Sequence, residues 1–138
     1  MKALDTPVLL DLLRGRSGAW KFLARHRSEE LATTELNMFE LEALAREGPP
    51  SGREHRLAAV ASLRRKMTVL PIDERAVAAG ARLSAGHSSL APSADWLMLG
   101  AAEGAGCASW VTSGTARFPK HPGKLRVEVL AANATKER

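Results

Sequence analysis

Short apolar runs and longer amphipathic segments alternate along the whole chain of 138 residues. Brief apolar or β-branched runs predict strands, and apolar positions spaced by three and four residues predict helices. The runs predict five strands, over residues 2–5, 31–34, 68–70, 107–111 and 125–130. The spaced positions predict six helices, over residues 8–13, 20–27, 36–46, 54–66, 74–85 and 94–105, the last with Ser93 as its N-cap.

Short strands that alternate with helices are typical of a parallel sheet covered by helices on both faces. The sequence therefore predicts an α/β fold: a single-domain, three-layer α/β/α structure with a short, mostly parallel central sheet over residues 1–132. A polar C-terminal tail is predicted over residues 133–138. In such folds ligands bind at the carboxyl ends of the strands, which directs attention to Asp5-Thr6, Thr33-Thr34 and Thr112-Ser113.

Length and composition are those of an ordinary globular domain, with 45% hydrophobic and 25% charged residues. No apolar run approaches the roughly 18–20 residues that cross a membrane, and Asp5 and Asp11 interrupt the start where a signal peptide would be apolar. A cytoplasmic protein with no membrane contact is therefore expected. The single cysteine, Cys107, has no partner for an internal disulfide, and the four histidines show no zinc-ligand spacing, which disfavours zinc or Cys–His chemistry.

The formal net charge of +5 is unevenly distributed, because residues 51–93 carry seven basic and three acidic residues whereas residues 1–50 carry seven and eight. A basic excess suits a polyanionic partner such as nucleic acid, and it equally serves solubility. Two groups of basic residues are either solvated surface or phosphate contacts. The first comprises Arg53, Arg56, Arg64, Arg65 and Lys66, and the second comprises Lys120, His121, Lys124 and Arg126.

Three carboxylates stand at positions that surface solubility does not explain. Asp5 closes the first predicted strand, where it also suits the N-cap of the helix that follows. Glu40 has Leu36 and Leu44 about 40° to either side on a helical wheel, which predicts that it faces the core. A buried carboxylate needs a partner, so Glu40 is predicted either to pair with an arginine or to bind a metal ion.

Asp95 opens the predicted helix over 94–105 and shares a face with Met98, Leu99 and Ala102. An acid in a first helical turn is also favoured by the helix dipole alone. The three acids nevertheless lie on elements that meet at one edge of a parallel sheet. Convergent carboxylates are the ligands that Mg²⁺ or Mn²⁺ requires, and metal-assisted hydrolysis of a phosphodiester is the matching chemistry.

Four stretches, in this order and at this spacing, resemble the motifs of the PIN domain family and most closely those of VapC-type toxins. They are MKALDTPVLLDLL with Asp5, LATTELNMFELEALA with Glu40, PSADWLMLGAA with Asp95 and SWVTSGTARFP with Thr112. The resemblance covers nearly the whole chain. It implies a Mg²⁺- or Mn²⁺-dependent endoribonuclease, the toxin of a toxin–antitoxin pair, which forms a homodimer and is inhibited by a small antitoxin protein.

The resemblance also implies a role for individual residues. Asp5, Glu40 and Asp95 take the catalytic and metal-binding positions: Asp5 and Asp95 hold the ion, and Glu40 binds it through water or orients the attacking water. The predicted contacts to the RNA substrate are Thr6, Thr112, Ser113 and Arg117.

Three positions depart from the family's pattern. Pro7 stands where Asn or Ser is common, Gly114 replaces an Asn, and Arg117 replaces an acid. These losses leave open an alternative in which the chain is a catalytically weakened PIN-fold module that binds RNA or a protein partner. A small phosphate-binding α/β domain is a third possibility. It is disfavoured because the glycines near the third motif suit close helix packing and a helix stop rather than a phosphate loop. These glycines are Gly100, Gly104 and Gly106.

Overall fold

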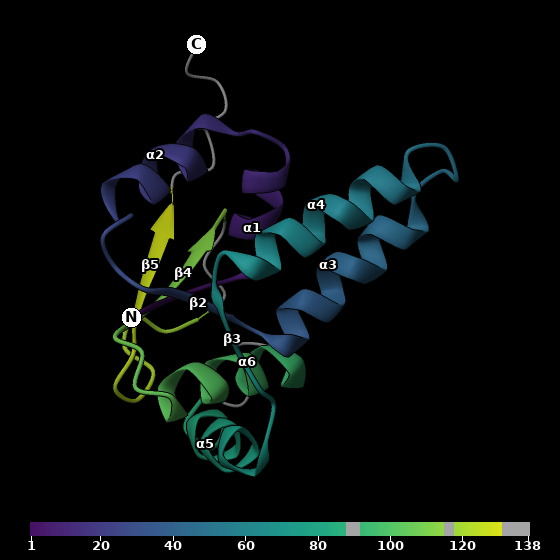
Figure 1. The fold of residues 1–138 in the computed structure, drawn as a ribbon. Helices are drawn as coiled ribbons and strands as arrows, with labels where there is room; N and C mark the ends of the chain where they lie inside the picture. Colours follow the sequence, from purple (N-terminus) through teal and green to yellow (C-terminus); the bar gives the residue numbers. More distant parts are fainter. Residues whose placement is uncertain (88–91, 115–117, 131–138) are drawn as a thin grey trace.

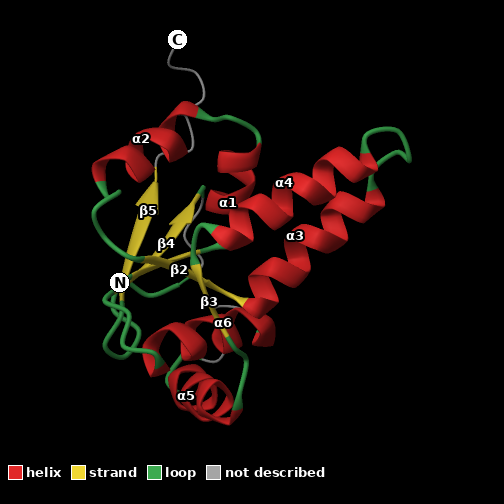
Figure 2. Cartoon of the chain, viewed as in Figure 1, coloured by secondary structure: helices red, strands yellow, loops and turns green. Residues whose placement is uncertain are grey.

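Five short strands lie side by side in one sheet of the computed structural model, which describes residues 1–87, 92–114 and 118–130 (Figure 2). The strand order is β3-β2-β1-β4-β5, and each of these neighbouring pairs is parallel. The strands are β1 (Lys2–Leu4), β2 (Leu31–Thr34), β3 (Thr68–Leu70), β4 (Ser109–Ser113) and β5 (Arg126–Leu130). The predicted parallel sheet is therefore confirmed, while the predicted tail over residues 133–138 lies outside the described residues.

Helices cover both faces of the sheet, as predicted (Figure 1). They are α1 (Thr6–Leu13), α2 (Ser17–Arg25), α3 (Glu35–Glu47), α4 (Arg53–Arg65), α5 (Glu74–Ala85) and α6 (Ser93–Gly104). Helices α1 to α4 share one apolar core with the sheet, and α5 and α6 share the other. None of the helices in the described ranges is long and apolar enough to span a membrane.

Alternation along the central strands supplies the two cores. Ala3 and Trp110 pack with α5 and α6, whereas Leu4 and Val111 pack with α1 to α4. Successive side chains of a strand point to opposite faces, so two neighbouring residues of each strand serve both layers. All four side chains are fully buried. The predicted three-layer architecture follows from this alternation.

Five of the six helices begin one to three residues earlier than the sequence predicts, and two of these starts have a clear local cause. Helix α6 begins at Ser93 with Pro92 in the N-cap position and no side-chain cap, so the predicted Ser93 cap is wrong. Proline fixes its backbone in the extended region that an N-cap adopts, which moves the boundary by one residue. Helix α1 begins at Thr6, two residues early, because Asp5 caps it and Pro7 is accommodated in the first turn.

Helices α3 and α4 form a hairpin that extends away from the sheet (Figure 1). Near its tip, the Arg56 guanidinium donates hydrogen bonds to the carbonyl oxygens of Ala45, Pro49 and Ser51. At its base, Arg64 donates to both carboxylate oxygens of Glu35, at 2.9 and 2.5 Å. Two arginines of the first basic group therefore brace this hairpin instead of projecting freely toward a phosphate.

The position of α6 depends on a close crossing with α5. A Cβ atom added to Gly100 would lie 2.4 Å from both the Ala76 carbonyl oxygen and the Gly80 nitrogen, which are backbone atoms that have no room to move aside. The predicted packing role of Gly100 is confirmed. Because Asp95 lies one turn and a half earlier in α6, this crossing also determines where that carboxylate stands.

Candidate active site

The candidate site lies where β1 and β4 end. Asp5 follows β1 directly, and Thr112 lies in β4, next to Val111, which is in register with Leu4. Because the strands are parallel, both residues reach the carboxyl edge of the sheet. The Thr112 Oγ1 atom donates to Asp5 Oδ2 at 2.8 Å, and both side chains are buried.

Within the described ranges, the Asp5 carboxylate accepts hydrogen bonds from at least three donors, which come from three different elements. Besides Thr112, the backbone N–H of Thr6 donates to Oδ1 at 2.8 Å, and Asn37 Nδ2 donates to the same oxygen at 3.4 Å. Asp5 is therefore the N-cap of α1, which was one of the two roles that the sequence suggested. In the same conformation it remains a candidate site residue. These hydrogen bonds fix the direction of the carboxylate, because donors reach both of its oxygens.

Glu40 lies on α3 at the border between core and surface. The buried residues of α3 are Asn37, Met38, Leu41 and Ala45, whereas Leu44 is 45% exposed, so Glu40 is at the flank of the buried face instead of at its centre. Its Oε1 atom accepts a hydrogen bond from Thr6 Oγ1 at 2.5 Å. Among the described residues its partner is thus a hydroxyl and not the arginine of the alternative interpretation.

Thr6 joins the two acids, since its N–H binds Asp5 and its hydroxyl binds Glu40. Asn37, which the sequence analysis did not single out, donates from Nδ2 to Thr6 Oγ1 at 2.9 Å. Its Oδ1 atom accepts from the N–H and the hydroxyl of Thr34, and the Asn37 backbone N–H donates to Thr34 Oγ1, which completes a capping box at the start of α3. The Thr-x-x-Asn spacing was the available sequence signal for this residue.

Asp95 approaches the site from α6. It lies in the first turn of that helix and is 8% exposed, so its predicted first-turn position is confirmed. One turn later, the Met98 sulfur lies 3.2 Å from Asn37 Nδ2, which places this part of α6 against α3. As the side chains stand, no three Asp, Glu, His or Cys residues of the described ranges form a group that holds a metal ion.

The donor chemistry of Asp5 and Glu40 nevertheless fits a hard divalent cation. Mg²⁺ prefers carboxylate oxygens and keeps several of its water molecules, so it is commonly bound through one or two carboxylates instead of a complete protein cage. Asp5 and Glu40 are tied to one residue, Thr6, at the edge of the sheet where ligands bind. Coordination by these acids stays a prediction.

The predicted substrate contacts occupy different environments. The hydroxyls of Thr6 and Thr112 are buried and bound to the two acids. Ser113 is partly buried and donates to Asp11 Oδ2 at 3.3 Å. Arg117 lies outside the described residues, so its role, like that of the other three, stays a prediction.

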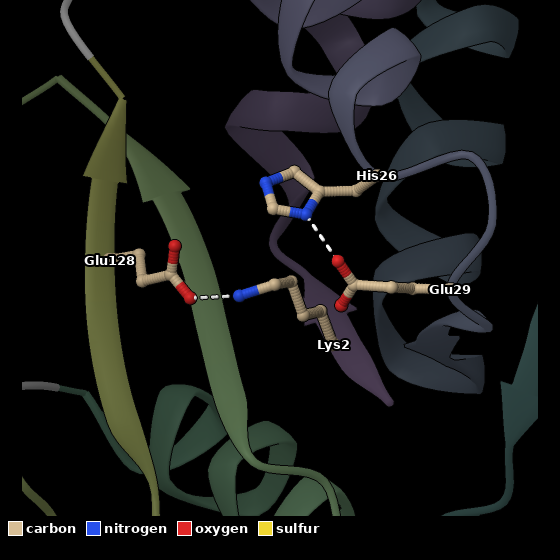
Figure 3. Close-up of polar contacts among 4 residues, drawn as sticks. All are labelled: Lys2, His26, Glu29 and Glu128. Atoms are coloured by element: carbon tan, nitrogen blue, oxygen red, sulfur yellow. Dashed lines mark hydrogen bonds and ion pairs between the residues drawn. The ribbon is translucent and has the colours of Figure 1, made fainter.

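The second basic group lies at the opposite edge of the sheet. Arg126 begins β5 and is in register with Ser109, which begins β4, and Val127 N–H donates to the carbonyl of Lys120. Figure 3 shows two pairs near the start of β1: Lys2 pairs with Glu128, from the middle of β5, and His26 pairs with Glu29, each at 2.5 Å. This basic group is therefore not beside the candidate site.

Comparison with known proteins identifies the fold. The chain is similar to one in the DNA-bound VapBC of Salmonella typhimurium, with a TM-score of 0.77, 19% identity and coverage of 93% of this chain and 96% of the other. It is also similar to a chain of a toxin–antitoxin complex from Klebsiella pneumoniae, with a TM-score of 0.72, 17% identity and coverage of 91% of this chain and 95% of the other. A third similar chain comes from VapBC-5 of Mycobacterium tuberculosis, a member of the VapBC family of toxin–antitoxin systems. Its TM-score is 0.62, with 23% identity and coverage of 95% of this chain and 98% of the other.

Sequence comparison leads to the same group of proteins. No curated protein sequence matches the chain. Residues 2–124, however, match the PIN domain family, and that stretch includes the whole candidate site and all but the last strand of the sheet. Because the match extends over most of the chain and the fold agrees with it, the chain belongs to the PIN domain family.

Proposed function

We propose that this chain is a Mg²⁺- or Mn²⁺-dependent endoribonuclease, the toxin component of a toxin–antitoxin pair. The observation that supports this most directly is the pair of acids, Asp5 and Glu40, that share Thr6 as a hydrogen-bond partner at the carboxyl edge of the sheet. From the resemblance to PIN domains, we expect the phosphodiester to be cut at this pair of acids.

Asp5, Glu40 and Asp95 would hold the cation. When bound, such an ion makes hydroxide available near neutral pH and stabilises the leaving oxygen of the phosphodiester. Thr112 and Thr6 orient Asp5, so that its carboxylate keeps one direction without a change of rotamer. Thr6 likewise directs Glu40, which would bind the cation through a water molecule or orient the attacking water.

The surface beside the site supports a protein partner. A groove of about 280 Å³ lies between α1 and the α3–α4 hairpin, and it is mostly apolar, with Leu10, Leu13, Leu41 and Leu44 in its lining and Arg14 among its polar residues. Leu41 and Leu44 lie within about one turn of Glu40 on α3. We place the antitoxin here because similar chains come from VapBC and other toxin–antitoxin complexes. The homodimer and the cytoplasmic location stay predictions.

The alternative of a catalytically weakened module rests on Gly114 and Arg117, of which only Gly114 lies in the described residues. Gly114 has φ of +79°, a conformation that glycine and asparagine adopt most readily among the residue types. Glycine and asparagine are therefore both compatible with the backbone at this position. The binding module is retained as one outcome of the experiment that follows.

The experiment incubates the purified chain, free of any partner, with single-stranded RNA and Mg²⁺ or Mn²⁺. We expect cleavage that EDTA abolishes and that Asp5→Asn reduces by at least about 100-fold. The matched control is Asp73→Asn, because Asp73 also caps a helix, accepting from the Ala76 N–H, but lies away from the site. Cleavage that survives EDTA or Asp5→Asn overturns the proposal, and RNA binding without cleavage supports the binding module.

A further inference from the structure

Asn37 contacts the elements that carry all three proposed acids. Its side chain is fully buried. The Nδ2 atom lies 3.4 Å from Asp5 Oδ1, 2.9 Å from Thr6 Oγ1 and 3.2 Å from the sulfur of Met98 in α6. A buried amide at such a junction restrains β1, α1, α3 and α6 relative to one another, because burial makes each lost hydrogen bond costly.

The amide is held in one orientation. The Thr34 N–H donates to Asn37 Oδ1 at 3.2 Å, and the Thr34 hydroxyl donates to the same atom at 2.6 Å. Because both Thr34 groups donate, the atom of the Asn37 amide that faces them must be the oxygen. The NH₂ group therefore faces Asp5 and Thr6.

This orientation determines the direction of the hydrogen bonds that reach Glu40. Thr6 Oγ1 accepts from Asn37 and therefore has its single hydrogen available for Glu40 Oε1. An aspartate at position 37 would accept where the amide donates, and it would compete with Glu40 for that hydrogen. An amide is therefore suited to position 37 in a way that a carboxylate is not.

We propose that Asn37 is a positioning residue that acts on Glu40 through Thr6 and so sets the affinity of the site for its divalent cation. The inference rests on the proposed function. It goes beyond it by assigning a role to a residue that would touch neither the cation nor the substrate. Groups that hydrogen-bond to metal ligands in this way typically change metal affinity by 10–100-fold when they are removed.

The test is a double-mutant cycle on Mn²⁺ affinity, measured by isothermal titration calorimetry on the full chain. We expect Asn37→Ala to weaken Mn²⁺ binding about 10-fold in the wild-type background and by no more than about three-fold in an E40Q background, where only its longer contact with Asp5 remains. Leu83→Val is the matched control, since Leu83 is a buried residue of α5 in the core away from α3. This control should leave Mn²⁺ affinity unchanged in both backgrounds.

Thr6 provides a second route, which keeps the test decisive should Asn37→Ala fail to fold. Thr6→Val removes the hydroxyl that links Asn37 to Glu40 and should weaken Mn²⁺ binding as Asn37→Ala does, whereas Thr6→Ser should restore it. The positioning role alone is overturned if the fold losses in Mn²⁺ affinity of Asn37→Ala and E40Q multiply in the double variant. It is also overturned if the Thr6→Val protein keeps wild-type affinity. A wild-type chain that binds neither Mn²⁺ nor Mg²⁺ overturns the proposed function itself.

Discussion

Thr112 and Asp5 lie 107 residues apart in the chain, and the hydroxyl of one donates to the carboxylate of the other at 2.8 Å. Both are buried, so removal of the hydroxyl takes away a hydrogen bond to Asp5 Oδ2 that water cannot easily replace. We expect Thr112→Val to lower kcat/KM for RNA cleavage by about 10–100-fold and the free energy of unfolding by about 1–3 kcal/mol.

The matched control for this change is Thr33→Val, measured by the same cleavage assay and by urea unfolding. Thr33 is a buried threonine of the neighbouring strand β2, and its hydroxyl donates to the Leu4 carbonyl at 2.8 Å. It should lose similar stability and keep its activity. Equal losses of activity in both variants would show that Thr112 matters only for folding.

Gly114 offers a test of backbone conformation without steric complication. Its φ is +79° and nothing lies within 4 Å of a Cβ added there. We expect Gly114→Asn to change the free energy of unfolding by less than about 1 kcal/mol and Gly114→Val to lower it by about 1–2 kcal/mol, because a β-branched residue resists this region. Urea unfolding measures both, and an asparagine as destabilising as valine would contradict the expectation.

The α5–α6 crossing should tolerate no added methyl group at Gly100. Gly100→Ala would bring Cβ within 2.4 Å of backbone atoms of α5, and we expect a loss of about 1–3 kcal/mol in thermal unfolding together with weaker Mn²⁺ binding, because α6 carries Asp95. Gly104→Ala is the control, since its neighbour at 3.1 Å is the flexible Arg75 side chain. A Gly100→Ala protein as stable as the control would mean that the two helices separate without cost.

The Lys2–Glu128 pair predicts a pH dependence of stability (Figure 3). Burial raises the pKa of Glu128, but hydrogen bonds from Lys2 and Ser109 outweigh it and leave the pKa below its ordinary value of 4.5. A lowered carboxyl pKa contributes stability above the ordinary value, and this contribution is lost as the pH falls through the lowered one. Lys2→Met should therefore destabilise the chain at pH 7, by up to about 1 kcal/mol.

Urea unfolding of the wild type and of Lys2→Met between pH 7 and pH 3 measures this effect. The difference between the two proteins should be constant above about pH 5 and should shrink at lower pH. Arg46→Met, which breaks a pair that is exposed on both sides, should have a smaller effect. A difference that grows as the pH falls would show that the sign is wrong.

Sequence periodicity predicted the layers and the parallel sheet because strands buried on both faces leave short apolar runs between longer amphipathic ones. It misplaced Glu40 for a physical reason. Leu36 and Leu44 suggested a core stripe, but α3 extends beyond the sheet, so Leu44 lines a surface groove and the buried face lies toward Leu41. Periodicity also cannot identify Asn37, since a buried polar residue is defined by partners that come from other elements.

The first strand of the chain is the middle strand of the sheet, and this has a consequence for the growing polypeptide. Asp5 is synthesised more than a hundred residues before Thr112, which β4 supplies. Until β4 has been synthesised, β1 lacks one of its two neighbouring strands and Asp5 lacks its Thr112 donor. Completion of the candidate site is therefore coupled to the synthesis of β4.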